Sequence, residues 1–122
     1  MSDPGTVATE FLLRWTDSFC SGDSDALVDL YTDAALFFGS APDLKRGMEG
    51  VRSYFTDLPS LHEPHVDFEV LASEAPTPGT VTCASMLTFR WTGHAGTRVR
   101  LTHALVEEDG DWRCVLHHAT TM

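Results

Sequence analysis

The stretch from Thr97 to Thr121 constrains the fold most, because it reads as two long β-strands joined by a tight turn. Apolar and polar side chains alternate along both halves, which is the period of a strand with one buried face. Asp109 and Gly110 are predicted to form the turn, since a type I′ hairpin needs a positive φ at both central residues and Asp-Gly tolerates this conformation. The other segments are expected to pack on this sheet.

The alternation divides the hairpin side chains between two faces of the sheet. If Asp109 and Gly110 are the whole loop, Leu105 lies opposite Cys114 and His103 lies opposite Leu116. One face is then apolar except for two histidines and a glutamate near the turn, and it collects Val99, Leu101, His103, Leu105, Glu107, Trp112, Cys114, Leu116 and His118. We interpret this face as the wall of a pocket.

Length and charge limit the class of protein. A chain of 122 residues can bury a real core, so we expect one domain over residues 1–122. The 8 basic and 18 acidic residues give a formal net charge of −10, which disfavours binding to nucleic acid or to an anionic membrane. The sequence has no apolar run of membrane-spanning length and no basic-then-apolar leader, so we expect a soluble, cytoplasmic protein.

The cysteines and the paired histidines do not form a metal-binding pattern. Cys20, Cys83 and Cys114 are scattered and no CxxC occurs, which favours buried free thiols over disulfides or a zinc site. His117 and His118 are adjacent, so on a strand their side chains point to opposite faces. We expect no metal and no cofactor.

Three helices are predicted before the sheet. The first is capped by Asp3 or Thr6, and its apolar residues recur at helical spacing. The second begins after Asp23 and carries Tyr31 on its inward side. The third covers residues 47–58 and ends at a proline.

Three more strands are predicted, over residues 34–39, 65–72 and 80–92, with a polar loop over residues 40–46. The order of helix, helix, strand, helix and then four antiparallel strands predicts an α+β fold. In such a fold helices cover one face of a curved sheet.

Several short sequences, in this order, resemble the NTF2-like superfamily: Ser21-Gly22-Asp23, Leu30-Tyr31-Thr32-Asp33-Ala34-Ala35 and Gly47-Met48-Glu49-Gly50-Val51. The final stretch, RLTHALVEEDGDWRCVLHHATT, is similar to the SnoaL-like branch, which contains SgcJ/EcaC-type proteins and the calcium/calmodulin-dependent kinase association domain. The resemblance covers nearly the whole chain. It implies a cone-shaped α+β domain with three N-terminal helices on the concave face of a curved antiparallel sheet, a pocket between them, and usually a dimer.

The superfamily includes ketosteroid isomerases and polyketide cyclases, but their catalytic residues are not matched here. An isomerase-like alignment places the catalytic carboxylate at Phe38 or Gly39, the helix tyrosine at Trp15, and the second acid near Thr102 or His103. These differences count against isomerase chemistry, which needs a base and a proton-donating pair. His103 matches the histidine of the cyclases, but no Asp lies on the predicted pocket face.

Arg90 is the main candidate for ligand binding. A four-residue connection over residues 93–96 places Arg90, Thr88 and Met86 on the same face as His103. A guanidinium that faces an apolar cavity requires an anion, so we expect a compact, acidic small-molecule ligand. The alternative is an arginine at the rim that pairs with an acidic residue of this chain.

His103 and His118 are the candidate catalytic bases on the predicted pocket face. The alternative for His103 is a histidine satisfied within the core, and His117 is expected on the surface or at an interface. A β-bulge would exchange part of these assignments, because a slip of one residue moves side chains to the other face.

The remaining candidates are aromatic. The helix side of the pocket is expected to be lined by Trp15, Tyr31, Phe38, Tyr54 and Phe55, for which the alternative is ordinary core packing. The outer face of the sheet is expected to carry Leu87, Phe89 and Trp91 and to form a homodimer.

Three functions are therefore open. The first is a small-molecule-binding protein of the SnoaL-like type with no nucleic-acid or membrane partner. The second is a cyclase, dehydratase or isomerase that uses a histidine base on a polyketide-like or steroid-like substrate. The third is a dimeric assembly module without catalysis.

Overall fold

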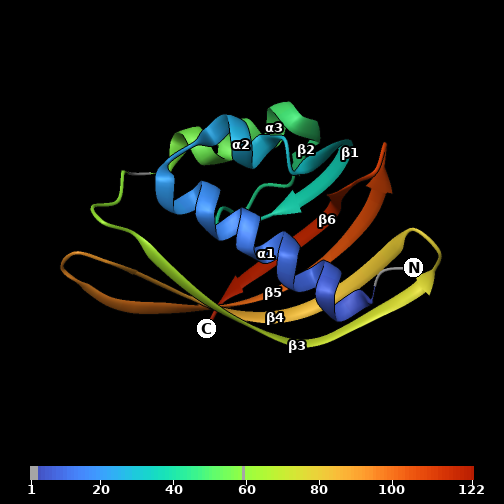
Figure 1. Cartoon of the computed structure of the whole chain (residues 1–122). Coiled ribbons are helices and arrows are strands. Elements are labelled where there is room, and N and C mark those ends of the chain that lie inside the picture. The colour runs from blue at the N-terminus through green and yellow to red at the C-terminus, as the bar shows by residue number, and fades with distance from the viewer. Residues whose placement is uncertain (1–2, 59) are drawn as a thin grey trace.

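A computed structural model describes residues 3–58 and 60–122 of the chain. The elements are α1 (Pro4–Ser21), α2 (Ser24–Val28), β1 (Tyr31–Phe38), β2 (Lys45–Arg46), α3 (Gly47–Asp57), β3 (His65–Thr77), β4 (Thr80–Trp91), β5 (His94–Glu108) and β6 (Asp111–Thr121). The strands form one sheet in the order β2-β1-β6-β5-β4-β3. Figure 1 shows the sheet curving beneath the helices, so the predicted α+β fold is confirmed. We call the face under the helices the inner face and the opposite one the outer face.

The ends of α1 and α2 follow from their capping residues. The Asp3 carboxylate accepts a hydrogen bond from the backbone N–H of Thr6 at 3.1 Å, and α1 ends where Gly22 adopts a φ of 73°. The Asp23 carboxylate accepts from the backbone N–H of Ala26 at 3.0 Å. Both helices begin where the sequence predicts. The apolar stripe of α1 is buried against the sheet.

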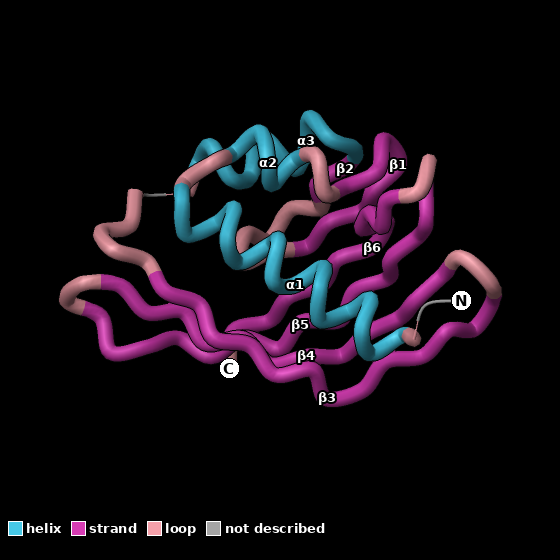
Figure 2. The backbone as a smooth tube through the Cα atoms, in the orientation of Figure 1, coloured by secondary structure: helices cyan, strands magenta, loops and turns pink. Residues whose placement is uncertain are grey.

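Two predictions about the first strand are wrong. Tyr31 does not lie on the second helix, because α2 ends at Val28 and β1 already begins at Tyr31. Lys45 and Arg46, expected in a polar loop, form the edge strand β2 beside β1. The sheet is also not purely antiparallel, since β1 runs parallel to β6, as the arrows in Figure 1 show. Figure 2 shows the two strands side by side.

The Asp109-Gly110 turn forms as predicted, with φ values of 52° and 85°. Leu105 lies opposite Cys114, but a bulge follows, so that Ala104 pairs with Leu116 and Val115 is the extra residue of β6. Beyond the bulge, every side chain of β6 lies on the face opposite to the one predicted.

The bulge overturns the predicted positions of two histidines. His117, rather than Leu116, lies opposite His103 on the inner face. His118 pairs with Thr102 on the outer face.

The predicted register of β4 with β5 is also wrong. The turn is the tight Thr92-Gly93 pair, with a φ of 84° at Gly93, and not a four-residue connection over 93–96. This turn and a register irregularity between Phe89 and Trp91 together place Cys83 opposite His103, where Met86 was predicted, which is a shift of three residues. Because three is odd, the shift exchanges the two faces of β4.

Candidate functional site

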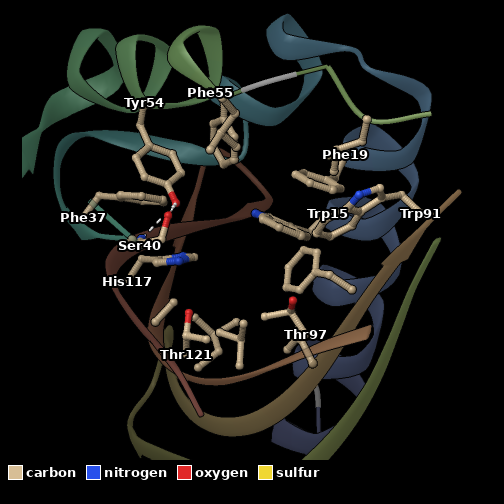
Figure 3. Close-up of a pocket in the computed structure, with 18 residues that line it drawn as sticks. Trp15, Phe19, Phe37, Ser40, Tyr54, Phe55, Trp91, Thr97, His117 and Thr121 are labelled. Atoms are coloured by element: carbon tan, nitrogen blue, oxygen red, sulfur yellow. Dashed lines mark hydrogen bonds between the residues drawn. The ribbon is translucent and has the colours of Figure 1, made fainter. Parts of the chain in front are cut away.

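A cavity of about 250 Å³ lies between the helices and the inner face of the sheet (Figure 3). Its described lining is mostly aromatic and aliphatic: Trp15, Phe19, Phe37, Gly39, Ser40, Tyr54, Phe55, Leu58, Leu61, Leu87, Phe89, Trp91, Thr97, Val99, Leu101, His117, Ala119 and Thr121. Helices α1 and α3, the end of β1, and strands β4 to β6 all contribute. Cavities of this kind are typical of small-molecule sites.

One wall is built from aromatic rings of α1 and β4. Trp15 and Phe19 are four residues apart, so they lie on the same side of the helix, and their rings stack with centroids 5.2 Å apart. Phe89 of β4 meets both rings edge to face, at 6.2 Å from Trp15 and 5.4 Å from Phe19. Stacked and edge-to-face pairs stabilise a protein by more than the burial of their apolar area alone. These contacts therefore hold the wall in place.

The opposite wall is centred on Phe37. The parallel register of β1 with β6 sets Phe37 beside His117, and the two rings stack with centroids 4.1 Å apart and planes at 19°. On its other side Phe37 contacts Tyr54 of α3, at 4.7 Å. Figure 3 shows Phe37, Tyr54 and His117 together, facing Trp15 across the cavity.

Tyr54 is held by the segment that follows β1. The backbone N–H of Ser40 donates to the Tyr54 hydroxyl at 2.9 Å, and the Ser40 hydroxyl lies 2.8 Å from it. A Cβ atom at Gly39 would lie 2.4 Å from the Tyr54 ring, so only glycine permits this close packing. The Ser40–Tyr54 pair forms a polar end to an otherwise apolar wall.

Besides the Trp15 indole, His117 is the buried polar side chain of the described lining, with 6% of its surface exposed. Its Nδ1 lies 3.1 Å from the Tyr31 hydroxyl, which accepts a hydrogen bond from Trp15 Nε1 at 2.9 Å. Burial lowers the pKa of His117 to about 3, with smaller contributions from His103 and His118. The imidazole is therefore neutral at ordinary pH.

His103 lies opposite His117 but does not line the cavity. It is 4% exposed, its ring is 5.6 Å from that of Phe11, and neither ring nitrogen has a partner among the described residues. Burial lowers the pKa of His103 to about 4. His103 is thus a neutral imidazole within the core, away from any ligand in the cavity.

Several predicted site residues are brought together by the fold. Trp15, Tyr54 and Phe55 line the cavity. Tyr31 lies behind the lining and reaches it through its hydrogen bond to His117.

Other predicted site residues lie on the outer face. Phe38 is there, with its ring 5.6 Å from that of His118. The shift of β4 also places Met86, Thr88 and Arg90 on this face.

Arg90 forms an exposed ion pair with Asp67. Hydrogen bonds from Arg90 and from His65 lower the pKa of the Asp67 carboxyl. The alternative for Arg90, pairing with an acidic residue of the chain, is therefore the one that the structure shows.

The same shift brings unpredicted residues into the cavity. Leu87, Phe89 and Trp91, expected at a dimer interface, line the cavity instead. His117, expected at the surface, joins them. The signal that could have identified the β4 residues is their apolar character, which suits an inner face better than an outer one.

Charged and metal-binding groups are scarce at the site. Among the described residues that line the cavity there is no Asp, Glu, Lys or Arg. Within residues 3–58 and 60–122, no three His, Cys, Asp or Glu side chains are grouped so as to hold a metal ion. No helix in the described part of the chain is long and apolar enough to cross a membrane.

Solved structures show the same fold at low sequence identity. A calcium/calmodulin dependent protein kinase II association domain, so named, from Xanthomonas campestris is 19% identical, with 100% of this chain and 89% of that chain covered and a TM-score of 0.84. A ketosteroid isomerase-like protein from Erwinia carotovora atroseptica is 12% identical, with coverages of 100% and 98% and a TM-score of 0.82. A hexachlorocyclohexane dehydrochlorinase is 14% identical, with coverages of 95% and 83% and a TM-score of 0.77.

At these identities the similarity establishes the NTF2-like fold and not a shared activity. No curated protein matches the sequence. A family model described as the SnoaL-like domain matches residues 9–122, which is nearly the whole chain. With this match, and with the NTF2-like fold that accompanies it, the chain belongs to the SnoaL-like domain family.

Proposed function

We propose that this protein binds a compact, uncharged and largely apolar small molecule in the cavity between the helices and the sheet. The observation that carries the proposal is the described lining, which combines seven Phe, Tyr and Trp side chains with no carboxylate, ammonium or guanidinium group. An ion placed there would lose its hydration without gaining a partner, at a cost of several kcal/mol, on the order known for buried charges. An apolar body gains instead from burial against the rings.

The comparisons support the same class of ligand. The similar dehydrochlorinase is named for hexachlorocyclohexane, which is a compact and uncharged compound. The prediction of an acidic ligand depended on Arg90 facing the cavity. That guanidinium faces outward and pairs with Asp67, so we no longer expect an acidic ligand.

An enzyme with a histidine base is the second candidate. It is favoured by His117, which lines the cavity and contacts a tyrosine hydroxyl. A general base works best when its pKa lies near the working pH, whereas burial lowers the pKa of His117 to about 3. Binding therefore has more support than proton transfer.

The binding proposal predicts a localised response in the tryptophan side chains. Titration of ¹⁵N-labelled protein with α-methylstyrene should shift the indole N–H signals of Trp15 and Trp91 in a saturable way, because both line the cavity. Trp112 does not line it and is the internal control. The carboxylate analogue 4-isopropenylbenzoate should bind at least about tenfold more weakly, because its charge must be desolvated. Equal shifts at all three indoles, or none, would contradict the proposal.

We also propose a homodimer, now through a different patch of the outer face. Leu36 of β1 pairs with Leu116 of β6. These two residues and the nearby Phe38 are each 40% or more exposed. A contiguous apolar patch of this kind is typical of an interface between copies.

The expected result is a dimer in sedimentation velocity at micromolar concentration. Leu116→Glu should yield the monomer, because a carboxylate would be buried in the interface. Leu13→Glu is the matched control, since Leu13 is 54% exposed on α1, and it should remain a dimer. A monomeric wild type would rule the dimer out.

A further inference from the structure

We infer that His117 is the polar recognition group of the cavity, a neutral imidazole whose Nε2–H donates a hydrogen bond to a carbonyl-type acceptor on the ligand. Tyr31 and Trp15 set the tautomer from behind. The inference rests on the proposed binding function and narrows it to a ligand class: compounds with an apolar body and one uncharged acceptor, such as ketones.

The tautomer follows from the hydrogen bonds behind the ring. The indole Nε1 of Trp15 can only donate, so the Tyr31 oxygen must accept in this 2.9 Å contact. The Tyr31 hydroxyl has one proton of its own, and His117 Nδ1 at 3.1 Å is its acceptor among the described residues. When Tyr31 donates to Nδ1, the proton of a neutral imidazole must be on Nε2.

The opposite tautomer is disfavoured. If Nδ1–H donated to Tyr31, the hydroxyl proton of Tyr31 would have no acceptor among the described residues. Tyr31 is 1% exposed, so water cannot replace the missing partner, and an unsatisfied buried donor costs about 1–3 kcal/mol. In the hydrogen-bond chain from Trp15 through Tyr31 to His117, every donor has an acceptor only when Tyr31 donates to His117 Nδ1.

The Nε2–H is available to a ligand. His117 lines the cavity, and no hydrogen bond to its Nε2 is formed by the described residues. Stacking on Phe37 at 4.1 Å fixes the plane of the ring. Figure 3 shows this ring on the cavity wall, across from Trp15.

The surroundings keep this donor neutral. Among the described residues, the His117 ring contacts the Phe37 ring and the Tyr31 ring and hydroxyl, His103 lies opposite it on β5, and the cavity lining holds no carboxylate. Burial lowers the pKa of His117 to about 3, so the ring does not become a cation that would select anions. It therefore offers one neutral donor and favours uncharged acceptors.

The tautomer can be read directly. Two-bond ¹H–¹⁵N correlation spectra of the wild type near neutral pH should show His117 with Nε2 protonated and Nδ1 unprotonated. Tyr31→Phe should weaken this preference, since the proton that Nδ1 accepts is removed while the ring remains. A wild-type His117 protonated on Nδ1, or on both nitrogens, would overturn the inference.

Recognition is tested with two ligands of the same shape, acetophenone and α-methylstyrene, which differ in C=O against C=CH2. The ratio of their dissociation constants is compared between the wild type and His117→Phe, so that differences in ligand hydration cancel. The variant should lose affinity for the ketone relative to the hydrocarbon by about threefold to tenfold, the range for one neutral hydrogen bond. His118→Phe, on the outer face, should leave the ratio unchanged.

The outcomes separate the two proposals. If neither compound binds the wild type, the binding function itself fails. If α-methylstyrene binds but the ratio in His117→Phe stays within about twofold of the wild type, the donor role fails and the binding function stands. If His117→Phe does not fold, Tyr31→Phe takes its place in the ratio experiment, and the wild-type tautomer decides independently.

Discussion

Lowering the pH from about 7 to about 5 should reduce the free energy of unfolding by about 4 kcal/mol, because His103 and His117 are buried as neutral imidazoles. Burial lowers their pKa values to about 4 and about 3, whereas an unfolded histidine has a pKa of about 6.5. Between these values the unfolded chain binds more protons than the folded one. Stability is therefore complete above about pH 6.5 and falls by roughly 1.4 kcal/mol per pH unit for each histidine.

Urea denaturation at a series of pH values measures this loss. The wild-type slope also contains the relief of repulsion among acidic residues as they are protonated, which acts in the opposite direction because the net charge is −10. Variants separate the two effects.

His103→Phe should remove about half of the loss, because one of the two buried titrating groups is gone. The same variant should be more stable than the wild type near pH 7 by about 1 kcal/mol, since neither nitrogen of His103 has a partner among the described residues. His62→Gln is the control, because the His62 side chain is 77% exposed and its replacement leaves both buried imidazoles in place. An unchanged slope in His103→Phe would contradict the assignment.

Phe37→Ala should destabilise the protein by about 3–5 kcal/mol and abolish ligand binding. The Phe37 ring is 1% exposed and contacts His117, Tyr54 and Phe55, with centroid distances of 4.1, 4.7 and 5.7 Å. Its removal leaves a hole in the wall that positions His117 and Tyr54. The measurements are urea denaturation and the tryptophan NMR titration.

Phe38→Ala is the matched control, because the next residue of β1 points to the outer face and is 40% exposed. Its effect on unfolding should stay below about 1 kcal/mol when measured at a protein concentration too low for association. It should bind α-methylstyrene as the wild type does. Similar losses in both variants would show that β1 does not present Phe37 to the cavity.

Local signals predicted the elements well. Asp3 and Asp23 cap the helices through contacts within three residues, and Asp109-Gly110 forms its turn from its own backbone preference. Each of these interactions joins residues that are close in the sequence, so the sequence alone predicts it. The same holds for the fold class, which follows from the order of the elements.

The site was harder to predict because strand register decides it. The bulge at Val115 has no residue signature, yet it exchanges His117 with His118 between the faces. The Thr92-Gly93 turn and the register irregularity between Phe89 and Trp91 together shift β4 by three residues, an odd number, and this removes Arg90 from the cavity. Such choices depend on packing across the whole sheet, whereas the aromatic residues of α1 and α3 needed only helical spacing to be found.

The most direct test of the account is a crystal structure of the protein soaked with 4-bromoacetophenone. The anomalous signal of bromine locates the ring, and the density locates the ketone. We predict one molecule between Trp15 and Phe37, with its carbonyl oxygen within hydrogen-bond distance of His117 Nε2. An empty cavity at saturating ligand, or a molecule seated on the outer face, would contradict the account.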